Sequence, residues 1–414
     1  RIAIHFWTKK PGYDKSLEER TFDFFLYEQA VKTQYVEEYS KLILACILGD
    51  QTLFVSVDEV KAQWKFVDPI LRAWQKNVAP LNHYTVGGSE MLEQSAALGL
   101  PQKLSPVVKE MAIVGLGKMG ANMAIRMLEK GWRVVGYDNY TESAKKLTAN
   151  GLEVAGSLEE AAGKLSGPKI IWLMVPAGKV VDEVLFGKNG LTKYLKRGDI
   201  VIDGGNSFYK DTITRGKKLR ELGIKFLDCG TSGGPSGARN GACLMIGGAK
   251  KDFIQVEKLF RDFSLPNGYQ FFSGIGAGHF VKMVHNGIEY GMMQAIAEGF
   301  TILKKFPFKL DLQKVADVYN HGSVIESRLV GWLGDAFRLY GQDLKQISGS
   351  VQQLGEGAWT VKTAREMKVA IRVIEDAFKF RLQSARRPSY PGQVVSALRG
   401  RFGGHEVAKK SKKK

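Results

Sequence analysis

Four polar residues that could take part in proton transfer stand at helical spacing in one apolar stretch, residues 276–290. The four are Lys282, His285, Asn286 and Glu289. On an α-helix this spacing places them on one face, with Lys282 and Glu289 two turns, or roughly 10.5 Å, apart. A lysine held among apolar groups can become a proton acceptor, and a nearby carboxyl group can serve as the partner acid. The spacing therefore predicts a helix that carries an acid–base site.

The ordinary alternative for a Lys/Glu pair is a solvated polar stripe on an amphipathic helix. Here the flanking apolar residues leave little of the helix surface for solvent. They are Phe280, Val281, Met283, Val284, Ile288, Met292 and Met293. A buried helix needs partners for its polar stripe, and this favours a site. We also expect Gly287 and Gly291 to leave room beside the stripe for a ligand or another backbone.

A second motif predicts a dinucleotide cofactor. A short apolar strand, residues 111–115, leads into the glycine turn of Gly115, Gly117 and Gly120 and then into a helix. In such a unit the pyrophosphate lies at the helix N-terminus. The next strand ends in Asp138, where a carboxylate would bind the ribose 2′-hydroxyl and repel a 2′-phosphate. This favours NAD, although nearby lysines make NADP possible.

Further strands and helices alternate after this unit, which predicts a doubly wound parallel sheet. The expected strands are residues 169–175, 199–203, 224–228 and 243–246. Three loops, residues 174–178, 203–207 and 230–234, follow strands at the edge where such sheets bind ligands. Each loop alone is more often a plain turn. Together they predict a pocket, with residues 174–178 lining the nicotinamide and Asn206 as a hydrogen-bonding side chain.

After residue 272 the pattern becomes helical to about residue 400, with caps or breaks at Pro307, Asp311, Gly322 and Pro391. The expected fold class is thus a Rossmann-like α/β domain followed by an all-α domain, preceded by a partial α+β fragment. The expected bounds are 1–90 for the fragment, 91–109 for a linker, 110–273 for the cofactor domain, 274–408 for the helical domain and 409–414 for a disordered basic tail. We expect the helical domain to cover the cleft and to supply much of a subunit interface.

Composition narrows the class of protein. The 414 residues are 44% hydrophobic, and no apolar run approaches the roughly 18 residues of a membrane span. Three scattered cysteines suit a reducing cytoplasm and argue against structural zinc. The net charge is +18, but five of those charges are lysines in residues 409–414, so we expect no nucleic-acid partner. The first residue is Arg1, which suggests a piece of a longer chain.

Residues 1–90 resemble the C-terminal part of glucose-6-phosphate dehydrogenase. The resemblance rests on FWTKKPG (6–12), LEERT (17–21), LGDQTLFVS (48–56) and WKFVDPI (64–70). The cofactor-binding domain and catalytic histidine region of that family lie upstream of this part. We therefore expect no glucose-6-phosphate turnover from this fragment alone.

Residues 110–408 resemble 6-phosphogluconate dehydrogenase, the decarboxylating enzyme, in its shorter bacterial form. The resemblance rests on GLGKMGAN (115–122), DGGNS (203–207), residues 276–290, EGAWT (356–360) and FGGH (402–405). It implies that Lys282 takes the C3 hydroxyl proton while hydride passes to NAD(P). Loss of CO2 then gives an enol, and Glu289 protonates C1 to yield ribulose 5-phosphate. No metal is implied, because protonated Lys282 can polarise the ketone.

The resemblance also implies the binding residues. Those for 6-phosphogluconate are Asn206, Ser232, Gly233, Gly234, His285, Asn286, Tyr290, Arg328, Thr360, Arg399 and His405. Those for the cofactor are Gly115, Gly117, Lys118, Met119, Gly120, Asp138, Val175, Pro176, Ala177 and Asn206. Arg399 and His405 would reach in from a second subunit, which implies a homodimer and allows a tetramer.

Two positions depart from the family pattern. The family commonly has a phosphate-binding arginine where this chain has Glu326, so Arg328 is expected to take that task. A basic residue often precedes Trp359, and here Ala358 stands there, which leaves Thr360. Two other functions stay open: a β-hydroxyacid dehydrogenase that does not decarboxylate, and a non-catalytic scaffold that joins two enzymes.

Overall fold

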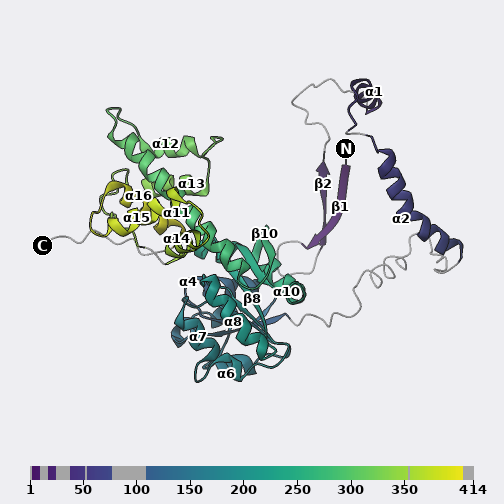
Figure 1. The fold of residues 1–414 in the computed structure, drawn as a ribbon, viewed down its shortest axis with the longest axis horizontal. Coiled ribbons are helices and arrows are strands. Elements are labelled where there is room, and N and C mark those ends of the chain that lie inside the picture. Colours follow the sequence, from purple (N-terminus) through teal and green to yellow (C-terminus); the bar gives the residue numbers. More distant parts are fainter. Residues whose placement is uncertain are drawn as a thin grey trace. The chain divides into compact units, whose positions relative to one another are not determined.

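The computed structural model describes residues 2–9, 17–24, 38–51, 54–76, 109–352 and 355–403. The chain divides into two compact units, residues 1–103 and 104–414 (Figure 1). Residues 91–108 of the expected linker, His405 and the basic tail all lie outside the described residues.

The first unit contains a two-stranded antiparallel sheet and two helices. Strand β1 (Ile2–Lys9) pairs with β2 (Leu17–Phe24), and the helices are α1 (Glu38–Leu48) and α2 (Val57–Gln75). A capping box begins α2, because Ser56 and Glu59 each accept the other's backbone N–H, at 3.2 and 2.7 Å. Pro69 lies inside α2, and the helix continues through it to Gln75. Trp64, Phe66 and Trp74 of this helix are exposed.

The second unit is built on an eight-stranded sheet with the order β10-β9-β8-β7-β6-β3-β4-β5. Its strands are β3 (Glu110–Val114), β4 (Arg133–Tyr137), β5 (Glu153–Val154), β6 (Ile170–Leu173), β7 (Ile200–Asp203), β8 (Lys225–Ser232), β9 (Ala242–Gly248) and β10 (Ser264–Ser273). Strands β3 and β6 are wholly buried, as expected for the centre of a doubly wound sheet.

Two strands run against the expected direction. Strand β9 pairs antiparallel with β8, and β10 pairs parallel with β9, so these two strands oppose the other six. The connection from Ser232 to Ala242 contains only the short helix α9 (Gly234–Asn240). A parallel crossover needs about a dozen residues or more, so this connection is too short to return the chain in the same direction.

Apolar layers cover both faces of the sheet. One layer includes Met123, Trp172 and Phe260, and the other includes Val114, Leu173 and Leu185. The helices of this part are α4 (Lys118–Glu129), α5 (Thr141–Lys145), α6 (Leu158–Gly163), α7 (Lys179–Phe186), α8 (Tyr209–Glu221), α9 and α10 (Lys250–Phe263). Two short 3₁₀ turns, Thr148–Asn150 and Leu191–Lys193, complete it.

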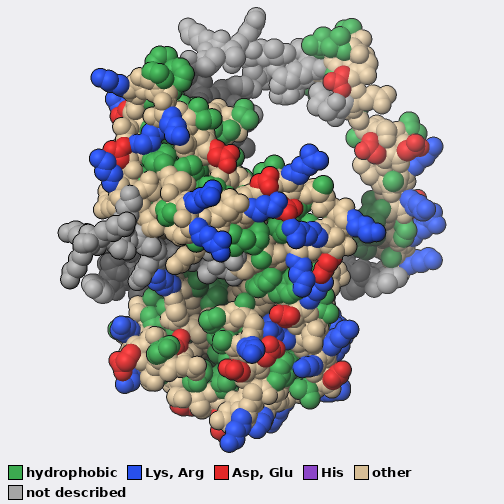
Figure 2. All heavy atoms as spheres, turned by 60° about the vertical axis from the view of Figure 1, so that its left-hand side comes forward, with side chains coloured by type: hydrophobic (Ala, Val, Ile, Leu, Met, Phe, Trp, Pro, Cys, Tyr) green, Lys and Arg blue, Asp and Glu red, His purple; other side chains and the backbone are tan. Residues whose placement is uncertain are grey.

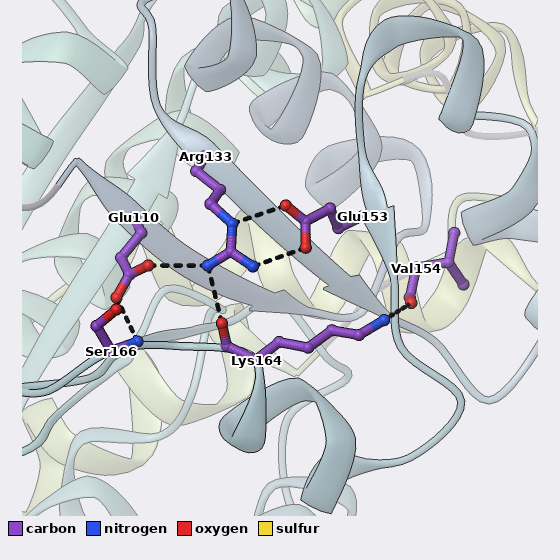
Figure 3. A network of polar contacts seen from close by, with 6 residues as sticks. All are labelled: Glu110, Arg133, Glu153, Val154, Lys164 and Ser166. Atoms are coloured by element: carbon purple, nitrogen blue, oxygen red, sulfur yellow. Dashed lines mark hydrogen bonds and ion pairs between the residues drawn. The ribbon is translucent and has the colours of Figure 1, made fainter.

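A polar network holds the starts of β3, β4 and β5 together (Figure 3). Arg133 donates two hydrogen bonds of 2.7 Å to the carboxylate of Glu153 and one of 2.9 Å to Glu110. Lys164 after α6 adds a hydrogen bond of 2.6 Å to the carbonyl of Val154. Because Glu110 and Arg133 are the first residues of parallel strands, this network lies at the edge opposite the ligand-binding edge. It is a structural cluster.

The rest of the unit is a set of helices, as expected. They are α11 (Ala277–Lys305), α12 (Leu312–Tyr319), α13 (Arg328–Tyr340), α14 (Glu356–Glu366), α15 (Arg372–Ser384) and α16 (Tyr390–Gly403). A third apolar core, which includes Met293, Phe300 and Leu398, holds them together. The long helix α11 begins against the sheet and runs into this third core. It therefore joins the sheet to the helical part of the unit (Figure 1).

Lysine and arginine side chains are scattered among acidic and apolar ones on the face shown in Figure 2. Among the residues that the structure describes, no helix combines the length and apolar character needed to span a membrane. Within the same ranges, no group of three or more His, Cys, Asp or Glu side chains is arranged to bind a metal ion.

Candidate active site

The position of α11 is fixed by a buried carboxylate of the sheet. Asp228 of β8 is fully buried and accepts the backbone N–H of Gly276 at 2.7 Å and that of His279 at 2.8 Å. These N–H groups belong to the first turn of α11, which has no helical acceptors of its own. The helix therefore begins at a fixed point on the sheet.

Glycines allow α11 to lie directly on the strands. A Cβ on Gly230 of β8 would overlap the side chain of Lys282, and a Cβ on Gly278 would overlap the carbonyl of Met245. The backbone of β8 thus touches the base of the Lys282 side chain without an intervening group. This contact sets the distance between the lysine and the sheet.

The four polar residues of α11 form the expected stripe. Lys282 is 5% exposed, and its Nζ donates to Asn286 Oδ1 at 2.8 Å. The same oxygen lies 2.9 Å from His285 Nδ1, while Ser232 Oγ lies 3.3 Å from His285 Nε2. Glu289 Oε2 lies 3.9 Å from His285 Nδ1. The stripe is therefore continuous from the lysine to the carboxyl group.

Burial shifts the pKa values of Lys282 and Glu289, at the two ends of the stripe, in opposite directions. Removal from water lowers the pKa of Lys282, although the charges of Glu289 and Glu356 oppose that shift. Burial also raises the pKa of Glu289, against the effect of Lys282, Arg381 and Arg399. The two pKa values move toward each other. A neutral amine beside a protonated carboxyl group, the form needed for acid–base chemistry, becomes more populated.

A cavity of about 270 Å³ opens beside this stripe. Most of the predicted substrate residues line it: Asn206, Ser232, Gly233, Gly234, Asn286, Tyr290 and Arg399, together with Lys282 and Glu289. Its wall also contains Glu356, Arg381 and Phe402, which the sequence analysis missed. His285 does not line this cavity; it lines an adjacent one of about 400 Å³ with Ser232 and Glu289.

A larger cleft of about 670 Å³ adjoins the cavity. Predicted cofactor residues that line it are Gly117, Lys118, Met119, Gly120, Val175, Pro176, Ala177 and Asn206. Met119, Asn206 and Glu356 line both spaces, so the cleft and the cavity meet at these side chains. Trp359 and Asp211 are further lining residues that the sequence did not indicate.

The glycine turn of the cleft fits a dinucleotide. Gly115 has φ +96°, and a Cβ there would overlap the carbonyl of Met174. A Cβ on Gly120 would overlap the carbonyl of Gly115, whereas Gly117 faces open space where a pyrophosphate can approach. Asp138 follows β4 and accepts the N–H of Leu116 in this turn at 2.7 Å. Asp138 therefore lies beside the glycine turn, although it does not line the cleft.

Comparison with known proteins gives the same assignment for both parts of the second unit, the sheet and the helices that follow it. A model of the NAD-binding domain of 6-phosphogluconate dehydrogenase matches residues 110–271, and one of the C-terminal domain of that enzyme matches residues 278–389. YqeC from Bacillus subtilis is 45% identical over 301 residues, which are 73% of this chain and all of that protein. The chain belongs to the 6-phosphogluconate dehydrogenase family. It is an NAD(P)-dependent oxidoreductase.

Other matches agree. The NAD(+)-dependent, decarboxylating 6-phosphogluconate dehydrogenase of Haloferax volcanii is 38% identical over 302 residues, 73% of this chain and 99% of that protein. Among solved structures, 6-phosphogluconate dehydrogenase of Plasmodium falciparum, described with NADP+ and with its substrate, matches with TM-score 0.59 and 26% identity over 70% of each chain. A model of the C-terminal domain of glucose-6-phosphate dehydrogenase matches residues 1–99, so the expected resemblance of the first unit is confirmed.

Some residues transferred from the 6-phosphogluconate dehydrogenase family lie away from the predicted contacts. Thr360 faces inward, with Oγ1 2.9 Å from the carbonyls of Met283 and of Glu356, and it does not line the cavity. Of the two roles expected for Gly287 and Gly291, room for a ligand or for another part of the chain, the structure shows the second. A Cβ on Gly287 would meet Thr360 of α14, and one on Gly291 would meet Val373 of α15. These glycines serve helix packing.

The basic residues also differ from expectation. Arg328 is exposed, lies over the Trp332 ring at 5.5 Å and lines the adjacent cavity, not the one beside Lys282. Arg399 lines the cavity of its own chain, because α16 packs on α11, and its arrival from a second subunit stays a prediction. Glu326 accepts the N–H of Gly322 at 2.8 Å and thereby holds the loop before α13.

Arg215 of α8 holds the loop of residues 174–178, which borders the cofactor cleft. It is 2% exposed, forms two hydrogen bonds of 2.8 Å to Asp182 and donates to the carbonyl of Gly178 at 2.9 Å. Gly178 lines the cofactor cleft. Sequence reasoning missed Arg215 because its two partners lie in another element.

We expect Arg215→Lys to raise the cofactor KM about tenfold with little change in kcat, because a lysine cannot form the paired bonds that fix the loop. Fluorescence titration with NADH checks the expected loss of affinity. The exposed Lys218 on the same helix supplies the control, Lys218→Met, which should match the parent. An unchanged cofactor affinity in Arg215→Lys would show that the loop holds its shape without this contact.

Proposed function

We propose that the chain oxidises 6-phosphogluconate at C3 and releases CO2, with NAD(P) as the hydride acceptor and ribulose 5-phosphate as the product. The observation that carries the proposal is the placement of Lys282 and Glu289 in one cavity that adjoins the cofactor cleft. A scaffold without activity would need neither a lysine of lowered pKa nor a carboxyl group of raised pKa at this place.

Lys282 acts first in this reaction. Its neutral amine accepts the proton of the C3 hydroxyl, and the bound dinucleotide takes the hydride from the same carbon. The products of this step are a 3-keto acid and a protonated Lys282. The ammonium group then donates its proton to the ketone oxygen as the C1–C2 bond of the substrate breaks and CO2 leaves, which gives an enediol and a neutral Lys282.

Glu289 completes the reaction. Loss of CO2 leaves an enediol whose nucleophilic carbon is C2 of the substrate and becomes C1 of ribulose 5-phosphate, and the protonated Glu289 carboxyl group donates its proton to that carbon. Burial keeps this carboxyl group protonated to a higher pH than usual because it raises the pKa of Glu289. The neutral Lys282 accepts the enediol hydroxyl proton in the same step. Solvent then takes the proton from Lys282 and returns one to Glu289, which restores both starting forms.

The cofactor preference proposed for this site is NAD over NADP. The Asp138 carboxylate follows β4 beside the glycine turn, where it can accept the ribose hydroxyl and repel a 2′-phosphate. We expect Asp138→Ser to lower the ratio of kcat/KM for NAD to that for NADP by about 10- to 100-fold, the effect of one charged hydrogen bond. Steady-state rates with both cofactors measure that ratio. A strong NADP preference in the unaltered protein would contradict the role given to Asp138.

The function itself is tested with the purified full chain and 6-phosphogluconate. Formation of NADH or NADPH together with one CO2 per reduced cofactor is expected. Reduced cofactor without CO2 would indicate the rival β-hydroxyacid dehydrogenase, and failure to bind NADH would indicate the scaffold. Glucose 6-phosphate should give no turnover. The homodimer and the cytoplasmic location stay predictions, and sedimentation and cell fractionation test them.

A further inference from the structure

Two residues of α14 lie where the cofactor cleft meets the cavity beside Lys282. Glu356, the first residue of this helix, is 8% exposed and lines both spaces, and Trp359 lines the cleft. The two residues are three positions apart, so they share one face of α14. The reaction proposed for Lys282 and Glu289 uses neither of them.

Hydride transfer determines where the nicotinamide ring of a bound cofactor must lie. The hydride passes directly from the substrate to the ring, so the two reacting carbons must come within about 3.5 Å of each other. Lys282 lines the cavity for the substrate, and the glycine turn lines the cleft for the pyrophosphate. The ring is therefore expected where the two spaces meet, beside Glu356 and Trp359. This step rests on the proposed function for the place of the substrate.

Contacts near both ends of α14 attach this helix to α8. The ring of Trp359, in the first turn, has its centre 5.4 Å from that of Phe208, the residue directly before α8. Glu366, at the other end, accepts a hydrogen bond of 2.6 Å from Lys210 of α8. The protein itself thus holds the Trp359 indole at the edge of the cleft.

Both side chains suit a positively charged group. The face of an indole ring attracts a cation, and a carboxylate attracts it more strongly. Burial lowers the pKa values of Lys282 and Arg399, and the charge of Glu356 opposes both shifts, so this charge acts close to the reacting groups. Arg381 and Arg399 line only the cavity, whereas Glu356 also faces the cleft. A cationic ring at the junction would therefore meet the carboxylate and the indole.

We propose that Glu356 and Trp359 border the nicotinamide ring and bind the oxidised cofactor more tightly than the reduced one. The oxidised ring carries one positive charge, and uptake of the hydride removes it. The ribose and phosphate groups are the same in both forms, so their contacts contribute equally to both affinities. The ratio of the two affinities therefore depends on the surroundings of the ring. Loss of the charge weakens the hold on the ring and helps the reduced cofactor to leave.

Calorimetric titration of the full chain with NAD+ and with NADH, without substrate, tests the proposal. We expect Trp359→Leu to raise the Kd for NAD+ about fivefold, the effect of one partly desolvated cation–π contact, and the Kd for NADH less than twofold. Glu356→Gln keeps the size of the side chain and should raise the Kd for NAD+ about tenfold, again with little effect on NADH. Trp359→Phe should recover part of the affinity, because a phenyl ring also attracts a cation. The matched control is Lys362→Met, because Lys362 is an exposed residue of the same helix.

The ratio of the two Kd values separates a contact with the ring from a structural role. Equal rises for NAD+ and NADH in Trp359→Leu and Glu356→Gln would show that the variants disturb the whole cleft, and would overturn the inference. An unchanged Kd for NAD+ in both variants would also overturn it. If Trp359→Leu does not fold, Glu356→Gln decides the question alone. A parent chain that binds both cofactors but does not turn over 6-phosphogluconate would refute the proposed function, while the Kd ratio would still decide this inference.

Discussion

Replacing Lys282 by methionine is expected to lower kcat for 6-phosphogluconate by about 10³- to 10⁴-fold, the usual contribution of a well-placed general base. Methionine fills the space above Gly230 but cannot accept the C3 hydroxyl proton or hydrogen-bond to the ketone. The rate of NADH formation at saturating substrate measures the effect. Lys305→Met, on the exposed last turn of the same helix, is the control and should keep the parent rate. If the Lys282→Met protein binds NADH and keeps a tenth of the parent kcat, Lys282 is not the general base of the reaction.

The lowered pKa of Lys282 sets the expected pH dependence of the parent and of the Lys282→Met variant. In the parent, activity requires a neutral Lys282 and a protonated Glu289, so kcat/KM should fall on both sides of a maximum. Burial lowers the pKa of Lys282, and the acid limb, where this amine takes up a proton, therefore extends to a lower pH than an exposed lysine would allow. In Lys282→Met the acid limb due to the amine should disappear.

Glu289→Gln is expected to separate the two halves of the reaction. Lys282 remains to support hydride transfer, but glutamine cannot protonate C1, so we expect steady-state ribulose 5-phosphate formation to fall by about 100- to 1,000-fold. The first turnover of NADH should survive. Stopped-flow absorbance would then show a burst followed by a slow phase. Glu298→Gln, an exposed acid on α11, is the control. A uniform loss of the burst and the slow phase would place Glu289 in the hydride step instead.

Local spacing was enough to predict the polar stripe of α11 and the glycine turn of the cofactor cleft. Lys282 and Glu289 are neighbours on one helix, so their common face follows from helical geometry alone. The cofactor turn is also local, because it contains Gly115, Gly117 and Gly120. The strand before these glycines and the helix after them identified the turn as a dinucleotide-binding motif. The alternation of strands and helices similarly predicted the doubly wound layers.

Contacts between distant elements could not be predicted in this way. Arg381 meets Tyr290 across a helix–helix contact, and its sequence neighbours do not show that contact. One signal was available: Arg381 shares the buried face of α15 with Ala377 and Ser384, at positions four before and three after it. Likewise, Arg328 was chosen for its nearness in sequence to Glu326, whereas its helix directs it to another cavity. The reversed strand β9 could have been inferred from the short connection before it.

The attachment of α11 to β8 has a consequence for how the cleft can open. Asp228 fastens the first turn of α11 to the sheet, and Gly230 and Gly278 leave no gap between them. The proton acceptor and the floor of the nucleotide cleft therefore move as one rigid body. We expect any hinge for substrate entry to lie beyond this anchor, so that α15 and α16 carry Arg381 and Arg399 toward Lys282, which stays in place.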